Sequence, residues 1–143
     1  MRFRAFKVLL LCFAIGILSC VVTPPAWALV KIELSDLSYK DCPAELAKGT
    51  VSSGDVSDAN CFLIIGKAIN KSGKYIYNAD IFGRIYDAND NPIMQNRSRL
   101  GSIDEVPPGV SDFEIRITVS VDQPTPLKLK QFKASGFTGV VRR

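Results

Sequence analysis

The chain has 143 residues, of which 18 are basic, 14 are acidic and none is histidine. Without histidine it lacks the ordinary proton shuttle near neutral pH, and no serine or carboxylate stands at a recognisable catalytic spacing, so we do not expect an enzyme. Three of the basic residues lie within the first seven positions, which leaves 15 basic and 14 acidic residues in the rest. That balance indicates neither a nucleic-acid partner nor an anionic lipid surface.

Residues 1–28 have the organisation of an export signal. Three basic residues precede an apolar run over 8–22, which predicts a signal helix, and a small-x-small cleavage motif ends at Ala28. We therefore expect 1–28 to be a signal peptide and 29–143 to be one domain. Two alternatives stay open. One is an uncleaved membrane anchor, although the run is short of the roughly 20 residues that span a bilayer, and the other is a lipoprotein modified at Cys20.

The exported segment begins with a strand, a helical turn and a loop. Alternating apolar and polar residues over 29–39 predict a half-buried strand. Residues 41–49 predict a single short helix, because Pro43 suits its first turn and Gly49 suits its end. The Gly/Ser/Asp-rich residues 50–60 predict a loop.

The next stretch predicts two strands joined by a turn. The near-continuous apolar run over 61–70 is typical of a strand buried on both faces, and Gly66 within it indicates a bulge or a close approach by another strand. Residues 70–74 predict the turn. The run over 75–86 carries aromatic residues on both faces and predicts a central strand. Strict alternation places its Ile76 on the face that bears asparagine, aspartate and arginine.

The last third predicts further strands. Residues 93–99 are polar enough for an edge strand. A proline-glycine turn over 106–109 leads to 112–121, whose alternation is typical of an amphipathic antiparallel strand. Within 127–140 the phase of the apolar residues slips, which indicates a weak strand with a bulge near Lys130-Gln131.

Six or seven short strands with this spacing predict an all-β fold, an antiparallel immunoglobulin-like β-sandwich. Cys42 and Cys61 remain after the signal, and an even pair in an exported protein predicts a disulfide. Closing that loop would contribute about 3 kcal/mol. Two free thiols or a metal pair are the alternatives, but two thiols without histidine supply too few ligands for zinc.

Phe82, Arg84 and Tyr86 form the candidate binding surface. They alternate along the long predicted strand, so they share one face. Aromatic side chains and arginine are enriched in binding hot spots, which favours a protein partner if this face is exposed. If the face is part of the core instead, Phe82 and Tyr86 are buried and have a structural role.

Asp87, Asn89 and Asn91 form a weak cation candidate. Their spacing is that of the first three ligands of a calcium loop, but Pro92 and Ser98 stand where such a loop needs glycine and glutamate. A turn in which these side chains bond the nearby backbone is therefore the favoured interpretation. The sequence predicts no catalytic residue, no metal centre and no cofactor.

Residues 65–73, 83–87 and 107–113 form three segments that resemble parts of FxLYD-type domains. Residues 65–73 are similar to a G-x-x-x-N-x-S/T-G motif of that family, and 107–113 to its proline-glycine-then-phenylalanine segment. Residues 83–87 occupy the place of the name motif, with Gly83 where the family has phenylalanine and Phe82 one position earlier. The resemblance implies a β-sandwich core. The end of the signal and the cysteine pair also resemble exported proteins of cyanobacteria, which implies the periplasm or the thylakoid lumen.

These observations predict an exported, non-enzymatic domain that binds another protein. It would act as an accessory or assembly module of a membrane complex, in the periplasm or thylakoid lumen and associated with the membrane. One alternative is a ligand- or ion-binding envelope domain that uses the loops over 43–60 and 87–91. Another is a membrane-tethered structural domain with an uncleaved signal anchor. Nothing in the sequence indicates a nucleic acid or a small-molecule substrate.

Overall fold

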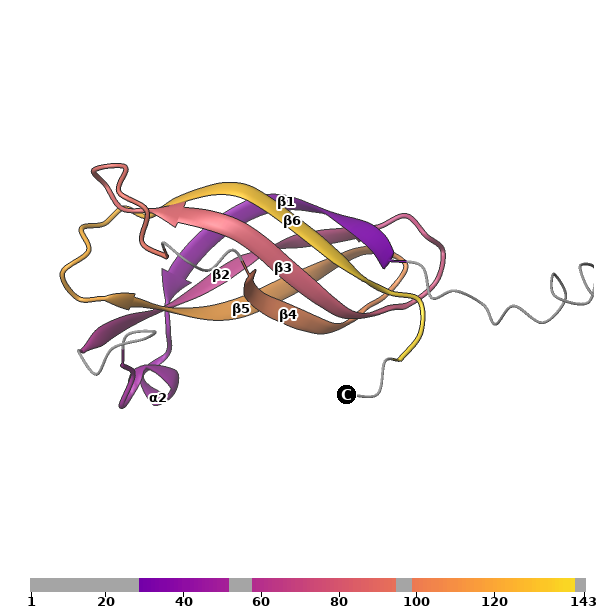
Figure 1. The fold of residues 1–143 in the computed structure, drawn as a ribbon. Helices are drawn as coiled ribbons and strands as arrows, with labels where there is room; N and C mark the ends of the chain where they lie inside the picture. Colours follow the sequence, from indigo (N-terminus) through magenta and orange to yellow (C-terminus); the bar gives the residue numbers. More distant parts are fainter. Residues whose placement is uncertain (1–28, 52–57, 95–98, 141–143) are drawn as a thin grey trace, which may run out of the picture.

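The computed structural model describes residues 29–51, 58–94 and 99–140, so the predicted signal segment and Cys20 lie outside the described residues. Across these residues the chain is all-β with one short helix (Figure 1). The elements are β1 (Leu29–Asp41), α2 (Ala44–Ala47), β2 (Ala59–Asn70), β3 (Ile76–Tyr86), β4 (Arg99–Val106), β5 (Gly109–Ser120) and β6 (Lys128–Phe137). Within the described part of the chain, no helix is both long enough and apolar enough to cross a membrane.

The strands form one antiparallel sheet in the order β4-β3-β6-β1-β2-β5. β1 links its two halves, because Leu29 to Ile32 pair with β6 and Glu33 to Asp41 pair with β2. The two end strands approach each other: a Cβ built on Gly101 of β4 would lie 3.3 Å from Cβ of Ile115 on β5. The sheet is therefore nearly closed around a single core. Figure 1 shows the strands wrapped in this way, with α2 at one end of the molecule.

The inward side chains of all six strands form that core. The amphipathic alternation predicted for 112–121 is confirmed on β5, where four apolar residues are buried and their neighbours are more exposed, although Val121 lies beyond the strand and is exposed. The largest fully buried side chains are Ile64, Ile76, Ile81, Ile85, Val106 and Val119.

Three strands contain a residue with positive φ at a break in the pairing register. Gln131 in β6 (φ 56°) confirms the predicted bulge. Asp36 in β1 (φ 51°) marks a second, and there the close approach predicted at Gly66 is confirmed: a Cβ on Gly66 would lie 2.9 Å from the Ser35 carbonyl oxygen. Asn78 in β3 (φ 49°) marks a third, which the sequence pattern did not reveal.

The bulge at Asn78 corrects the predicted faces of β3. Strict alternation placed Ile76 on the outer face, but Ile76 is fully buried beside Ala79. Tyr75 and Tyr77 lie outside instead, with ring centroids 6.4 Å apart. The extra residue changes the phase, so only the part of β3 after Asn78 follows the predicted alternation.

The predicted strand over 93–99 is wrong where the structure describes it. Ile93 and Met94 lie in an irregular segment and pack against the core, and the edge strand β4 begins at Arg99. Residues 95–98 lie outside the described part. The C-terminal strand also ends earlier than predicted, at Phe137. By contrast, the turn over 70–74 and the two strands that it joins are confirmed to within about two residues at each end. The short helix is confirmed as well, but it spans only Ala44–Ala47 of the predicted 41–49.

The predicted cysteine pair is confirmed as a disulfide. Cys42 and Cys61 have their Cα atoms 5.3 Å apart and their sulfur atoms bonded. The amide of Cys42 also donates to the carbonyl of Cys61 at 3.0 Å. Together these bonds hold the segment that carries α2 against the start of β2.

Candidate functional site

The candidate binding residues lie together on the outer face of β3. Because Ile81, Gly83 and Ile85 point into the core, alternation directs the residues between them outward. Arg84 is exposed, and Phe82 and Tyr86 are half-buried. The structure therefore places all three predicted residues on one accessible face, and the two aromatic residues are not part of the buried core.

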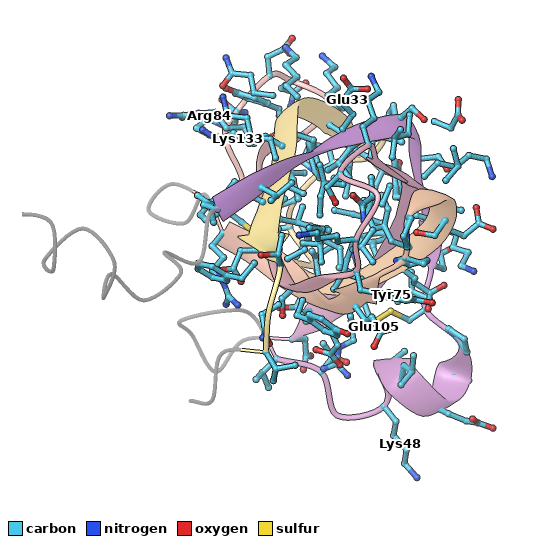
Figure 2. The ribbon with its side chains drawn as sticks, turned by 90° about the vertical axis from the view of Figure 1, so that its right-hand side faces the viewer. Glu33, Lys48, Tyr75, Arg84, Glu105 and Lys133 are labelled. Carbon is cyan, nitrogen blue, oxygen red and sulfur yellow. A yellow bond between two sulfur atoms is a disulfide. The ribbon has the colours of Figure 1, made fainter. Side chains whose placement is uncertain are left out.

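Strand β6 adds three lysines to this face. The pairing register sets Lys133 opposite Phe82, Lys130 opposite Arg84 and Lys128 opposite Tyr86. Figure 2 shows Arg84 and Lys133 projecting from the same side of the molecule, away from Glu105. We call this surface the cationic–aromatic face. It consists of Phe82, Arg84, Tyr86, Lys128, Lys130 and Lys133.

The bulge at Gln131 brings the three lysines of β6 to the same face of the sheet. Lys128 and Lys130 are two positions apart and share a face by simple alternation, but Lys133 is three positions from Lys130. The extra residue at Gln131 restores the outward direction for Lys133. The phase slip in the sequence pointed to this bulge, but only the register with β3 shows which lysines meet the candidate residues.

Asp90, in the turn after β3, binds two of these lysines. Its carboxylate oxygens lie 2.7 Å from Nζ of Lys128 and 3.3 Å from Nζ of Lys130. These hydrogen bonds lower the pKa of Asp90, with Lys128 contributing most. Nζ of Lys130 also lies 4.8 Å from the centroid of the Tyr86 ring, a cation–π arrangement. The lysines at this end of the face are thus held in place by one carboxylate and one ring.

At the neighbouring edge of the face, Arg99 of β4 is paired with Asp80 of β3. Nε and Nη2 of the guanidinium donate to Oδ1 of Asp80 at 2.9 and 2.6 Å. Arg84 and Lys133 form no ion pair within the part of the chain that the structure describes. With respect to these residues, the positive charge of the face that has no carboxylate partner lies at Arg84 and Lys133.

The cation candidate is occupied by hydrogen bonds of its own turn. Oδ1 of Asp87 accepts from the amides of Asn89 and Asn91, both at 2.8 Å, and Oδ2 accepts from Nδ2 of Asn91 at 3.0 Å. Burial of Asp87 would raise its pKa, but the hydrogen bonds from Asn91 and Asn89 outweigh burial and lower it. Among the described residues, no group of three or more cysteine, aspartate or glutamate side chains is arranged to hold a metal ion.

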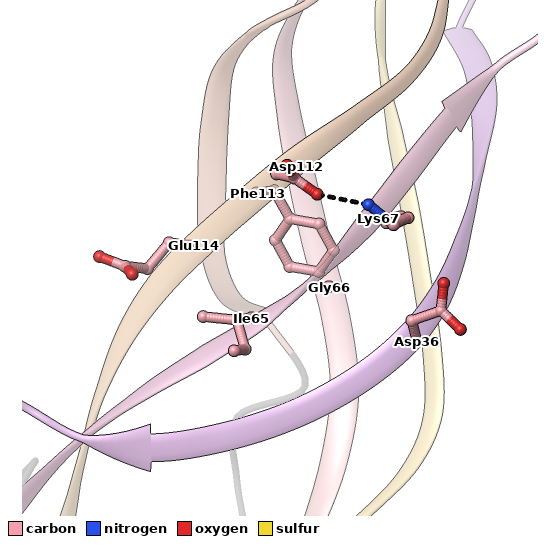
Figure 3. A pocket seen from close by; sticks show the side chains of 7 residues that line it. All are labelled: Asp36, Ile65, Gly66, Lys67, Asp112, Phe113 and Glu114. Atoms are coloured by element: carbon pink, nitrogen blue, oxygen red, sulfur yellow. Dashed lines mark hydrogen bonds and ion pairs between the residues drawn. The ribbon is translucent and has the colours of Figure 1, made fainter.

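A second surface feature is an open hollow of about 420 Å³ over β2 and β5, beside the bulge of β1 (Figure 3). Lys67 and Asp112 cross it with an Nζ–Oδ1 distance of 2.8 Å, and this hydrogen bond with its charge raises the pKa of Lys67. The hollow was not predicted from the sequence. Its lysine is already neutralised, so the hollow presents no free cation. It is lined by Asp36, Ile65, Gly66, Lys67, Asp112, Phe113 and Glu114.

Comparison of the chain with protein-family models, with curated proteins and with solved structures finds no match. The resemblance to FxLYD-type domains therefore stays a prediction from the sequence.

Proposed function

We propose that this protein is an exported, non-enzymatic β-sandwich module that binds another protein through the cationic–aromatic face. The observation that carries the proposal is the face itself, where one arginine, three lysines and two aromatic residues project from two neighbouring strands. Arginine and tyrosine, together with tryptophan, are the residue types enriched among those that dominate binding energy at interfaces.

The position of the face in the sheet supports this proposal. Along the face β3 and β6 are hydrogen-bonded to each other, whereas β4 pairs with β3 only as far as Phe82 and β1 pairs with β6 only from Ala134 onward. A surface held in this way loses little conformational entropy on binding. Phe82 and Tyr86 are half-buried, so part of each aromatic side chain stays accessible to a partner.

The finer description of the fold and its location belong to the same proposal. We describe the sheet as an immunoglobulin-like sandwich, with β1 passing from the layer of β6 to the layer of β2, and we assign the chain to the FxLYD-type domains. The signal pattern over 1–28 and the Cys42–Cys61 disulfide support export to an oxidising compartment, the periplasm or the thylakoid lumen. There the module would serve as an accessory or assembly factor of a membrane complex.

Site-specific photo-crosslinking tests the proposal. A photo-crosslinking amino acid is placed at Lys133 in the full chain, and the chain is expressed in its own host. The matched control carries the same amino acid at Arg116, which is exposed on β5 and forms no ion pair among the described residues. We expect a discrete protein adduct from position 133 and none from position 116. No adduct at 133, or the same adducts at both positions, would refute the proposal.

A further inference from the structure

We propose that the cationic–aromatic face binds an extended acidic segment of its partner, with carboxylates at alternate residues. This inference rests on the proposed function and names the chemistry of the partner. Its basis is the register of β3 with β6, which places positive side chains at three successive levels along the strands, the last of which, Lys128, is already paired with Asp90. The levels are Lys133 opposite Phe82, Lys130 opposite Arg84, and Lys128 opposite Tyr86.

The spacing of these levels fits a strand-like ligand. Outward residues of a β-strand repeat about every 7 Å, and side chains on one side of any extended peptide repeat at the same interval. A segment with acidic residues at alternate positions therefore presents one carboxylate to the level of Lys133 and the next to the level of Arg84. Phe82 and Tyr86 lie on either side of Arg84 along β3, and their rings offer apolar contact to the backbone and methylene groups of such a segment.

Binding of a carboxylate is most strongly favoured at the middle level, that of Arg84 and Lys130. Arg84 and Lys130 face each other across the strands, and like charges directly opposite destabilise a sheet. The described residues provide no acidic partner within 4.0 Å of Arg84. Among these residues, Lys130 is paired only with Asp90, whose carboxylate also binds Lys128. A carboxylate above this pair relieves the repulsion and can accept two parallel hydrogen bonds from the guanidinium.

Two acidic side chains at the margins distinguish a peptide from a continuous polyanion. Asp90 lies beside Lys128 and Lys130, and Asp80 lies beside Arg99. A membrane leaflet or a nucleic acid places negative charge over the whole face, including these carboxylates. A peptide can place its carboxylates at the levels of Lys133 and Arg84 and neutral residues beside Asp90 and Asp80. In addition, Phe82 and Tyr86 are half-buried, so they do not protrude as membrane-inserting residues do.

The experiment is a titration of the full chain at about 0.1 M salt, where the Debye length is about 10 Å, with a synthetic nine-residue peptide that has glutamate at two alternate positions and threonine elsewhere. The matched peptide has glutamine in place of glutamate. We expect saturable binding of the glutamate peptide only. Arg84→Glu should weaken it about ten-fold or more, the order expected for loss of hydrogen bonds to a charged group. Lys133→Glu, at another level, should weaken it as well.

Arg116→Glu on β5 is the matched control variant, because it makes the same change of residue and charge at an exposed strand position. Its affinity should stay within about two-fold of wild type, since charges beyond a Debye length are largely screened. Thermal unfolding identifies any variant that fails to fold. Equal weakening by Arg84→Glu and Arg116→Glu, or equal binding of the glutamine peptide, would overturn the inference.

Two further probes separate the other polyanions. The probes are phosphatidylserine vesicles and a single-stranded oligonucleotide. If either binds in a way that depends on Arg84, at concentrations where the glutamate peptide does not bind, the inference is overturned as well. A protein adduct from Lys133 without peptide binding would overturn the acidic-segment inference alone. Absence of both the adduct and peptide binding would remove the proposed function as well.

Discussion

Asn70 ties together two turns at one end of the sheet, and its substitution tests how the fold is held. The residue is buried, with 2% of its surface exposed. Nδ2 donates to the carbonyl oxygens of Lys74 (2.7 Å), Val106 (3.0 Å) and Pro107 (3.2 Å). Oδ1 accepts from the amide and the hydroxyl of Ser72, at 3.0 and 2.7 Å. One amide group thus joins the turn after β2 to the turn between β4 and β5.

Asn70→Ala should lower the free energy of unfolding by about 3 kcal/mol. The carbonyl of Val106 is bonded to Nδ2 in a buried position, and a buried polar group that loses its partner costs about 1–3 kcal/mol. The groups of Ser72 and Lys74 are exposed and can turn to water, so their bonds add about 1 kcal/mol in total. A domain of this size is stable by roughly 5–15 kcal/mol, so the loss is easily measured.

Urea unfolding of wild type, Asn70→Ala and Asn70→Asp provides the assay. Asn70→Asp keeps the acceptor for Ser72 but turns an ionised oxygen toward three carbonyl oxygens, so at pH 7 it should be less stable than Asn70→Ala. In acid, where the carboxyl is protonated and can donate, it should recover relative to alanine. Asn89→Ala, at an exposed side chain in another turn, should stay within about 0.5 kcal/mol of wild type. A loss below about 1 kcal/mol for Asn70→Ala would refute this reasoning.

Three other predictions concern the core, the disulfide and the Asp87 turn. A Cβ on Gly83 would lie 2.6 Å from the Phe132 ring, so Gly83→Ala should lower the free energy of unfolding by about 1–3 kcal/mol. The loss should be smaller in a Phe132→Leu background, and additive effects of the two substitutions on the urea midpoint would contradict this. Replacing Cys42 and Cys61 by serine should lower the free energy of unfolding by about 3 kcal/mol, and reduction of the wild-type disulfide should have the same effect. An unchanged urea midpoint would contradict this prediction. The lowered pKa of Asp87 contributes stability that is present above its unfolded value of 3.8 and lost as pH falls through the folded value. Urea unfolding between about pH 5 and pH 2 should therefore show a weaker pH dependence for Asp87→Asn, and equal slopes would count against it.

The sequence predicts the fold well where alternation runs unbroken. β5 alternates from Phe113 to Val119, and the structure buries the apolar residues as that pattern requires. Alternation fails where an extra residue enters a strand. Asn78 has φ 49° and reverses the phase of β3, but asparagine is also common in regular turns, so its presence alone does not mark a bulge. β4 was missed because Gly101, Asp104 and Glu105 are poor strand formers, and pairing with β3 decides its conformation.

Half of the candidate site was predictable. Phe82, Arg84 and Tyr86 follow from the alternation of one strand, since a single strand is a local feature. The lysines of β6 lie more than 40 positions further along the chain, and only the pairing register brings them to these residues. Register depends on core packing and on the positions of bulges, and neither can be read from the sequence pattern of a single strand.

The cationic–aromatic face is coupled to the core through one glycine. The Phe132 ring lies against Gly83, in the space that a side chain there would need, so Phe132 points inward and its neighbour Lys133 must point outward. A one-residue slip of β6 would bury Lys133 and expose Phe132, so this contact helps to fix the register after Gln131. Gly83 contacts no ligand in the proposed complex. Yet a side chain at Gly83 that displaces Phe132 should also weaken binding of the acidic peptide, because moving Phe132 shifts the backbone that orients the neighbouring Lys133.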